Sequence, residues 1–298
     1  MLPLEATKKE SLMASLQLEG KTALVSAAGR GIGRGIALAL AEAGANLIVN
    51  SYAEETTAST AEAVRALGRE ALAFPGDITD PAIIVDCVDA GLKRFGRIDI
   101  LINNVGAAPK SAIEPDAGPL AGPAAIWDAL YAQNLKPVVL MCEALIPHLK
   151  RQGGGKIINL SSIAGRASLS AKMLDHFVHP SYSAMKAALV NYTQTLAEQL
   201  GPHNINVNAI CPGIVYTDAW AGNAQRAVSH MPEFKGQDPR QWFEGIARGD
   251  YPEIFDRTPL KREQTVEDMG NAAVFLASAA AKNITGQSLM VDGGMVKC

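Results

Sequence analysis

Short apolar runs alternate with longer stretches of helical periodicity from Lys21 almost to the end of the chain. The runs carry few polar residues on either face, which is typical of strands in a sheet that helices cover on both sides. Because strand and helix alternate without a break, the pattern predicts an α/β fold built on a doubly wound, mostly parallel seven-stranded sheet. The expected strands are 21–26, 46–50, 71–74, 98–103, 155–160, 205–210 and 287–291.

Glycine and proline mark the expected helix ends. Asp80-Pro81 predicts a helix start, with aspartate as the N-cap and proline in the first helical position. Four glycines follow helical patterns and are expected in the left-handed conformation just after the last turn: Gly44, Gly68, Gly96 and Gly201.

The chain of 298 residues is expected to hold a polar extension over 1–19 and one catalytic domain over 20–298. Residues 217–258 lack a strand pattern and hold several aromatic residues, among them Trp220, Trp242 and Phe243. A structureless loop of that length is improbable in a compact domain. We expect one or two short helices that form a substrate lid. The alternative is a surface insertion that packs on its own aromatic residues.

A glycine-rich turn, Ser26–Gly33, follows the first strand and opens the first helix. Backbone N–H groups at a helix N-terminus can bind a pyrophosphate, and glycine lets the backbone come close to it. The literal G-x-G-x-x-G pattern is absent, so the turn alone is a weak signal. Its position between first strand and first helix favours nucleotide binding over a simple tight turn.

Tyr182 and Lys186 are spaced i and i+4, which places them on one face of a helix. A free phenol has a pKa near 10 and exchanges protons poorly at neutral pH. A fixed ammonium nearby favours the phenolate, so the pair is a candidate for acid–base chemistry. Taken alone, the spacing favours an exposed helical pair without a catalytic role.

The combination of motifs resembles the short-chain dehydrogenase/reductase family over about residues 20–295. The matching elements, in chain order, are the turn at 26–33, Asp77-Ile78, Asn103-Asn104-Val105-Gly106, Asn134, Ser161-Ser162-Ile163-Ala164-Gly165, Tyr182-x-x-x-Lys186, Cys211-Pro212-Gly213 with Thr217, and Asp292-Gly293-Gly294. The resemblance implies a Rossmann-type oxidoreductase that transfers a hydride between NAD(P)(H) and an alcohol or carbonyl carbon.

The resemblance also implies four catalytic residues. Tyr182 would be the general acid in reduction and the base in oxidation, and Lys186 would lower the pKa of Tyr182 and bind the nicotinamide ribose. Ser162 would hydrogen-bond the substrate oxygen, and Asn134 would hold a water for proton relay. Ser161 competes with Ser162, but the family's S-x-x-G pattern selects Ser162, which Gly165 follows.

The cofactor-binding residues expected from the resemblance line the carboxyl ends of the strands. They are Ser26, Gly29, Arg30, Gly31, Ile32, Gly33, Asn50, Ser51, Tyr52, Asp77, Ile78, Asn104, Gly106, Tyr182, Lys186, Pro212, Gly213, Ile214 and Thr217. The alternatives for Asp77 and for the asparagines at 103–104 are turn or capping roles.

Two residues favour NADP over NAD. Ser51 stands where NAD-preferring relatives place an aspartate, and Arg30 can bind a 2′-phosphate. The alternative is that Arg30 and Arg34 are solvated and the enzyme accepts NAD.

Two departures from the family pattern are Val105 for alanine and Ala27 for the first glycine of the turn, where we expect φ to stay negative.

Two enlarged loops, 107–123 and 166–180, are expected to border the substrate mouth. His176 and His179 have no acidic or cysteine partner at metal-ligand spacing, so we expect substrate contact or loop packing and no metal site. With the aromatic residues of 217–258, these loops predict a largely apolar substrate, a ketone or secondary alcohol.

Composition narrows the class of protein. Hydrophobic residues make up 48% and charged residues 19%, with a formal net charge of −3, so a nucleic-acid partner is not expected. Cys87, Cys142, Cys211 and Cys298 are widely spaced and predict small buried side chains of a reduced compartment. No secretory signal or apolar run of membrane-spanning length is evident, so a cytoplasmic protein with no membrane partner is expected.

Three other readings stay open: a cofactor-binding regulatory protein without turnover, an NAD-dependent dehydrogenase of the same family, and a non-redox use of the cleft. Family resemblance further implies a homo-oligomer, a tetramer that packs through the helices around 124–150 and 181–200.

Overall fold

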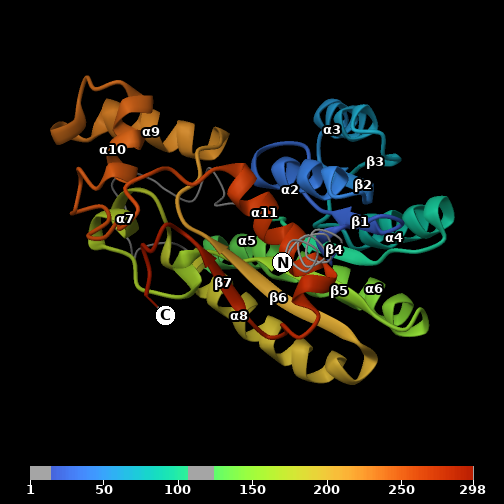
Figure 1. Cartoon of the computed structure of the whole chain (residues 1–298). Helices are drawn as coiled ribbons and strands as arrows, with labels where there is room; N and C mark the ends of the chain where they lie inside the picture. Colours follow the sequence, from blue (N-terminus) through green and yellow to red (C-terminus); the bar gives the residue numbers. More distant parts are fainter. Residues whose placement is uncertain (1–14, 107–123, 298) are drawn as a thin grey trace, which may run out of the picture.

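The computed structural model describes residues 15–106 and 124–297. Its centre is a sheet of seven strands in the order β3-β2-β1-β4-β5-β6-β7, and every neighbouring pair is parallel (Figure 1). The α/β prediction and all the predicted strand positions are confirmed. The strands are β1 (Thr22–Val25), β2 (Asn46–Ser51), β3 (Ala71–Pro75), β4 (Ile100–Asn103), β5 (Gly155–Leu160), β6 (Ile205–Pro212) and β7 (Ser288–Val291).

Helices cover both faces of the sheet. In β1, Ala23 and Val25 face one apolar cluster and Leu24 faces the other, as the period-two alternation of a strand requires. The first cluster includes residues of α2 (Gly31–Glu42), α3 (Glu54–Ala66) and α11 (Val266–Ala277). The second includes residues of α4 (Pro81–Phe95), α6 (Lys136–Arg151) and α8 (Pro180–Leu200), and α5 (Ala124–Asn134) packs beside α6 and α8.

Burial falls from the centre of the sheet to its edges. All residues of β1 and β4 are buried, whereas β3 and β7, the two edge strands, are only partly buried. The continuous apolar character expected of a doubly covered sheet therefore holds for the inner strands. Those inner strands are also the ones that hold the candidate site.

Most of the predicted helix ends are confirmed. Asp80 caps α4, since its carboxylate accepts the Ala82 N–H at 2.9 Å. Gly44, Gly68 and Gly96 have positive φ. The prediction for Gly201 is wrong: its φ is −49°, because the chain continues from α8 into a 3₁₀ turn, η2 (Gly201–His203). The left-handed residue lies three positions later, where Asn204 has φ +58°.

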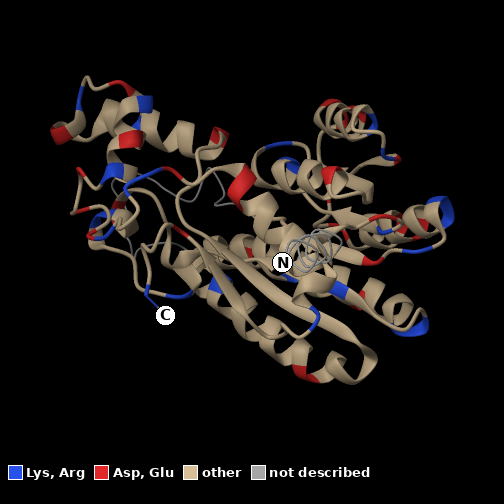
Figure 2. Cartoon of the chain, in the orientation of Figure 1, with Lys and Arg blue, Asp and Glu red and all other residues tan. Residues whose placement is uncertain are grey.

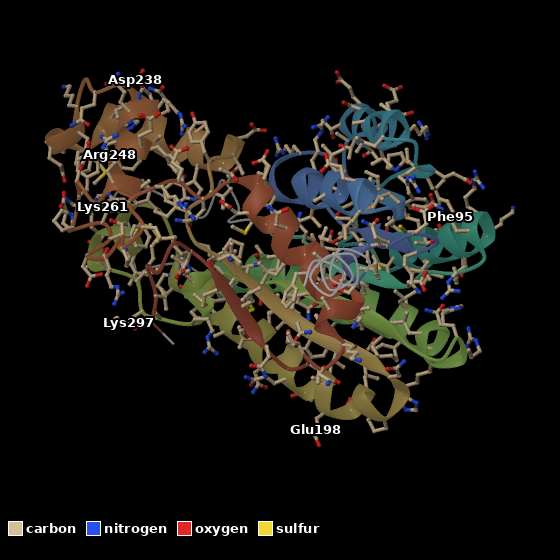
Figure 3. The ribbon with its side chains drawn as sticks, viewed as in Figure 1. Phe95, Glu198, Asp238, Arg248, Lys261 and Lys297 are labelled. Atoms are coloured by element: carbon tan, nitrogen blue, oxygen red, sulfur yellow. The ribbon has the colours of Figure 1, made fainter. Side chains whose placement is uncertain are left out.

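The segment expected as a lid folds into helices α9 (Asp218–His230) and α10 (Pro239–Arg248), joined through the 3₁₀ turn η3 (Pro232–Phe234). The helices lie to one side of the sheet, above α7 (Ala171–His176) in Figure 1. Figure 3 shows the labelled Asp238, Arg248 and Lys261 at this end of the molecule and Phe95 at the opposite end. The remaining short turns are η1 (Ile163–Gly165) and η4 (Ala279–Ala281).

The lid shares an apolar cluster with α7 and the segment that follows it. Trp242 is fully buried, and its ring centroid lies 5.8 Å from that of Phe177 and 5.6 Å from that of Phe234. Phe243 is 1% exposed and contacts Trp220 at 5.7 Å. Most of the aromatic rings that the sequence suggested for a substrate pocket therefore pack on one another.

The surface carries both signs of charge, spread over the helices and the lid (Figure 2). Cys87, Cys142 and Cys211 are buried and not in disulfides, while Cys298 and the loop 107–123 lie outside the described residues, as does most of the extension 1–19. No helix of the described chain combines the length and the apolar character needed to cross a membrane.

Candidate active site

The strand order reverses beside β1. The chain runs from β1 outward through β2 to β3, then returns to place β4 on the other side of β1. In an open parallel sheet, the crevice at the carboxyl ends of such strands is where ligands bind. The turn after β1 and the segment Asn103–Gly106 after β4 meet at this crevice.

Glycine is required in the turn after β1 by close contacts. A Cβ on Gly33 would lie 2.4 Å from the Ala27 carbonyl oxygen and 2.5 Å from Asn104 Nδ2. Gly31 has φ +53° and faces the Thr217 side chain. Arg30, the residue before α2, makes no side-chain cap, so no side-chain cap occupies the first N–H groups of this helix. The turn thus fits a pyrophosphate, which would accept hydrogen bonds from these groups.

Ala27 differs from its expected conformation. Its φ is +50°, so the prediction of a negative φ is wrong. The Ala27 carbonyl accepts a hydrogen bond from Asn104 Nδ2 at 3.1 Å, and its neighbour Ala28 donates to the Asn50 carbonyl at 2.7 Å. These long-range bonds hold the turn in a left-handed conformation that is costly for an alanine.

Two of the expected cofactor residues lie beneath the crevice and support it. The buried Ser26 hydroxyl donates to the Ile102 carbonyl at 3.3 Å and accepts the N–H groups of Asn104 and Val105 at 3.0 and 3.2 Å. The buried Asn50 amide donates to backbone carbonyls of the β3 segment at 3.1 and 3.2 Å. Their side chains join neighbouring strands and so fix the carboxyl edge of the sheet.

Four candidate catalytic residues from distant parts of the chain converge at this edge. Lys186 is 3% exposed, and its Nζ donates to the Leu160 carbonyl at 2.9 Å and lies 5.6 Å from the Tyr182 ring centroid. Tyr182 is hydrogen-bonded to Ser162. A Cβ on Gly106 would lie 2.7 Å from Asn134 Oδ1 and 3.0 Å from Lys186 Nζ, so these atoms meet above the glycine.

The two adjacent serines have different partners. The Ser161 hydroxyl is buried and donates to the Lys186 carbonyl at 2.8 Å, which anchors α8 to the end of β5. The Ser162 hydroxyl caps η1 by accepting the Ala164 N–H at 3.1 Å and bonds Tyr182. Only Ser162 therefore presents its hydroxyl beside the tyrosine.

Burial perturbs both members of the Tyr–Lys pair. Desolvation lowers the pKa of Lys186 to about 8, since an ammonium is costly to bury. Desolvation also raises the pKa of Tyr182, and the hydrogen bond with Ser162 opposes that rise. Burial thus brings the pKa of Lys186 closer to neutral pH. It moves the pKa of Tyr182 upward, whereas acid–base exchange at neutral pH would need a lower value.

The remaining cofactor candidates flank the crevice. Asp77 is exposed and accepts bonds from the Thr79 N–H and hydroxyl at 2.9 and 2.8 Å, while Ile78 beside it is buried. Ser51 and the exposed Tyr52 end β2, with Ser51 Oγ close to Gly29. On the lid side lie the other candidates: Ile32, Pro212, Gly213, Ile214 and Thr217, of which Ile214 is 3% exposed.

Arg30 has a partner that the sequence did not indicate. Its Nη1 lies 3.3 Å from Asp218 Oδ2 in the first turn of α9, and both side chains are 75% exposed. Nothing in the sequence links these residues, which are 188 positions apart. The ion pair joins the glycine turn to the lid.

His179 and Gln264 also lie near the site without a clear signal in the sequence. His179 caps α8, since Nδ1 accepts the Ser181 N–H at 3.2 Å. The signal available was Pro180, because proline favours the first helical position and makes the residue before it the N-cap. Gln264 Oε1 would lie 2.2 Å from a Cβ on Gly213, so this side chain packs against the residue that follows β6.

Taken together, a pyrophosphate cradle at the sheet's switch point and a clustered Tyr–Lys–Ser–Asn group define an NAD(P)-binding oxidoreductase. The chain belongs to the short-chain dehydrogenase/reductase family. The family model described as "short chain dehydrogenase" matches residues 21–227, and one described as "Enoyl-(Acyl carrier protein) reductase" matches residues 244–296.

Known proteins similar to the chain over nearly its whole length act on different substrates. L-rhamnose 1-dehydrogenase (NAD(P)(+)) of Sphingomonas sp. (strain SKA58) is 32% identical over 93% of this chain and 97% of its own. The structure of L-sorbose reductase from Gluconobacter frateurii, with NADPH and L-sorbose, is 27% identical with a TM-score of 0.81, covering 95% and 99% of the two chains. A 7α-hydroxysteroid dehydrogenase structure with NADH and 7-oxo glycochenodeoxycholic acid is 30% identical with a TM-score of 0.76, covering 94% and 96%.

Proposed function

We propose that this protein transfers a hydride between NADP(H) and the carbonyl or secondary-alcohol carbon of its substrate. The observation that carries the proposal is the convergence of Tyr182, Lys186, Ser162 and Asn134 beside the glycine cradle. A regulatory protein without turnover would have no need of a buried lysine beside a tyrosine, because burying an ammonium lowers stability.

The proton chemistry follows from the hydroxyls beside the crevice. The bound nicotinamide cofactor supplies the hydride in reduction and accepts it in oxidation. In reduction, the Tyr182 hydroxyl gives its proton to the substrate oxygen while the Ser162 hydroxyl donates a hydrogen bond to the same oxygen. In oxidation, the Tyr182 phenolate takes the proton of the alcohol.

Lys186 and Asn134 serve Tyr182 in this scheme. The Lys186 ammonium stabilises the phenolate that forms after proton transfer, and it would also hold the nicotinamide ribose. Asn134 lies next to Lys186 across Gly106 and would hold the water through which the pair exchanges protons with solvent. With a pKa of about 8, Lys186 can release and regain a proton near neutral pH.

NADP(H) is proposed over NAD(H) because of charge at the ribose end of the crevice. Ser51 ends β2 without a carboxylate, and the exposed Arg30 guanidinium can turn from Asp218 to a 2′-phosphate, which it binds bidentately. The relatives named above use either cofactor, so the family alone does not decide.

The substrate is proposed to have an apolar body. Trp127 of α5 is 43% exposed and lies beside the start of α8, and the partly exposed Trp220 contacts Phe177 at 6.0 Å. These two tryptophans can face a ligand, whereas the inner rings of the lid pack on one another. Relatives include an enzyme bound to a sugar and one bound to a steroid acid, so this pocket sets the choice within a broad family.

The test is Tyr182→Phe, assayed by reduced-cofactor absorbance with a panel of ketones and both NADPH and NADH. Because the variant lacks the acidic proton, turnover should fall by about 10²- to 10⁴-fold, while NADPH binding measured by cofactor fluorescence stays. Tyr131→Phe, at an exposed tyrosine of α5, is the matched control and should keep full activity.

Other outcomes discriminate the alternatives. Undiminished hydride transfer in Tyr182→Phe would refute the mechanism. Cofactor binding without turnover on any ketone or alcohol would favour a regulatory role, and substrate conversion without net change in cofactor would favour isomerisation or dehydration. Equal catalytic efficiency with NADH would refute the cofactor preference alone.

A further inference from the structure

His179 lies at the start of α8 with 8% of its surface exposed, and its two ring nitrogens are in different situations. Nδ1 accepts the Ser181 backbone N–H at 3.2 Å and lies 2.5 Å from the Ser181 hydroxyl oxygen. A nitrogen that accepts a backbone N–H cannot itself carry the proton, so the neutral ring carries it on Nε2. Burial lowers the pKa of His179, which keeps the ring neutral at pH 7.

The Nε2–H group is a buried donor without a hydrogen-bond acceptor among the residues that the structure describes. Leaving such a group unpaired costs about 1–3 kcal/mol, so unpaired donors are uncommon in folded proteins. Capping of α8 does not explain it, because Nδ1 makes every capping contact. Serine would cap the helix as well without burying a second polar atom.

The surroundings of the ring place this donor at the substrate side of the site. His179 is the N-cap of α8, three residues before Tyr182, and its carbonyl accepts the Tyr182 N–H at 2.9 Å, so the two residues belong to the same first turn. The Trp127 ring packs edge-on against the imidazole, with centroids 6.3 Å apart and planes at 82°. Phe177, two residues earlier, connects the same segment to Trp220 of the lid.

We infer that the His179 Nε2–H donates a hydrogen bond to a second oxygen of the substrate, which makes His179 a specificity-determining residue. The inference rests on the proposed function and narrows its substrate class to ketones or secondary alcohols that carry another acceptor oxygen close to the reacting carbon. Three residues, a rise of about 4.5 Å, separate the two residues at the start of α8, so a single small molecule can reach both. The tryptophans Trp127 and Trp220 would contact the apolar part of the same molecule.

A donor of this kind discriminates strongly between related substrates. A site built to hydrogen-bond a substrate oxygen rejects the analogue that lacks it, because the protein's donor is then left buried and unpaired. The wild-type enzyme should therefore reduce a hydroxyketone about tenfold more efficiently than the plain ketone of the same skeleton.

The experiment uses the full-length enzyme and His179→Asn, a substitution that keeps an N-cap side chain and removes the Nε2–H. The probes are two ketone pairs that differ by one hydroxyl next to the carbonyl: cyclohexanone with 2-hydroxycyclohexanone, and acetophenone with 2-hydroxyacetophenone. We expect the variant to lose about tenfold in kcat/KM on the hydroxyketones, mainly through KM, and to leave the plain ketones unchanged. His203→Asn, at an exposed histidine of η2, should change neither.

Thermal unfolding of both variants separates capping from recognition. An unchanged Tm with loss of the hydroxyketone preference supports the inference. A lowered Tm with the preference intact means that His179 only caps the helix, and equal losses on both members of a pair mean that it acts through Tyr182; either result overturns the inference. It is also overturned if wild-type enzyme shows no preference for the hydroxyketones. Failure of the Tyr182→Phe test would instead overturn the proposed function, whatever His179→Asn does.

Discussion

The carboxyl edge of the sheet and the lid stabilise themselves by different means. At the sheet edge, backbones approach so closely that only glycine fits at Gly33, and polar side chains such as Lys186 are buried. In the lid, aromatic rings around Trp242 pack on one another in a largely apolar cluster. The edge therefore fixes the positions of reactive atoms, while the lid depends on side-chain volume and can differ between relatives without disturbing the chemistry.

The largest expected effect tests whether the lid unfolds independently of the sheet. Trp242→Ala should remove about 3–5 kcal/mol of packing, because the fully buried ring contacts Phe177, Phe234 and Tyr251. We expect the loss to fall on the lid, so hydrogen exchange should accelerate in α9 and α10 and stay slow in β1 and β4.

The matched variant in the sheet is Ile48→Ala, at a fully buried position of β2. It should cost about 2–5 kcal/mol and lower the protection of all core strands together. If Trp242→Ala and Ile48→Ala gave the same pattern of exchange, the lid and the sheet would be one cooperative unit and the distinction would be wrong.

The same contrast explains what could be predicted from the sequence. The strands were predictable because each inner strand is buried on both faces and so reads as an apolar run. The positions of Ser162, Tyr182 and Lys186 were suggested by resemblance to family motifs, and the i, i+4 spacing placed Tyr182 and Lys186 on one face of a helix.

What could not be predicted depends on contacts between distant segments. Ala27 has a positive φ because Asn104, 77 positions away, binds its carbonyl, and no local pattern reveals that bond. Gly201 has a right-handed φ because η2 extends α8 to Asn204. The aromatic residues of the lid were expected to be buried. The sequence alone did not show whether they would contact a substrate or pack on one another.

Two glycine substitutions test the difference between the sheet edge and the lid by adding a single Cβ atom to each. Gly33→Ala should cost about 3 kcal/mol, since the new Cβ would overlap the Ala27 carbonyl and the Asn104 amide. Gly222→Ala, at an exposed position of α9 with nothing within 4 Å of the new Cβ, should stabilise by about 0.5–1 kcal/mol through helix propensity. Urea denaturation measures both changes.

Cofactor fluorescence adds a second measurement to this pair. Gly33→Ala should also weaken NADPH binding, because the shifted turn can no longer present its N–H groups, whereas Gly222→Ala should leave binding unchanged. A tolerated Gly33→Ala with normal binding would show that the turn relaxes easily, and that the edge is less constrained than its contacts indicate.

The smallest expected effect concerns the cost of keeping an ammonium buried at the sheet edge. The pKa of Lys186 is about 8 in the folded protein, below the value of about 10.4 for an exposed lysine in the unfolded chain. Below pH 8 both states hold the proton, and the folded state carries the full cost of burying the charge. As the pH rises from about 8 to about 10.4, the folded protein releases its proton first, so stability from this group increases with pH.

Lys186→Met removes the charge and keeps a side chain of similar length. We expect the variant to be about 2 kcal/mol more stable than wild type at pH 7, after allowing about 1 kcal/mol for the lost hydrogen bond to the Leu160 carbonyl. The gain should shrink at pH 9.5, while hydride transfer falls sharply at both pH values. Lys150→Met, at an exposed lysine of α6, is the control and should show no pH-dependent gain. If the Lys186→Met protein were less stable than wild type at pH 7, the lysine would be retained for packing. If the variant were more stable but inactive, the lysine would be retained for its charge, at the expense of stability.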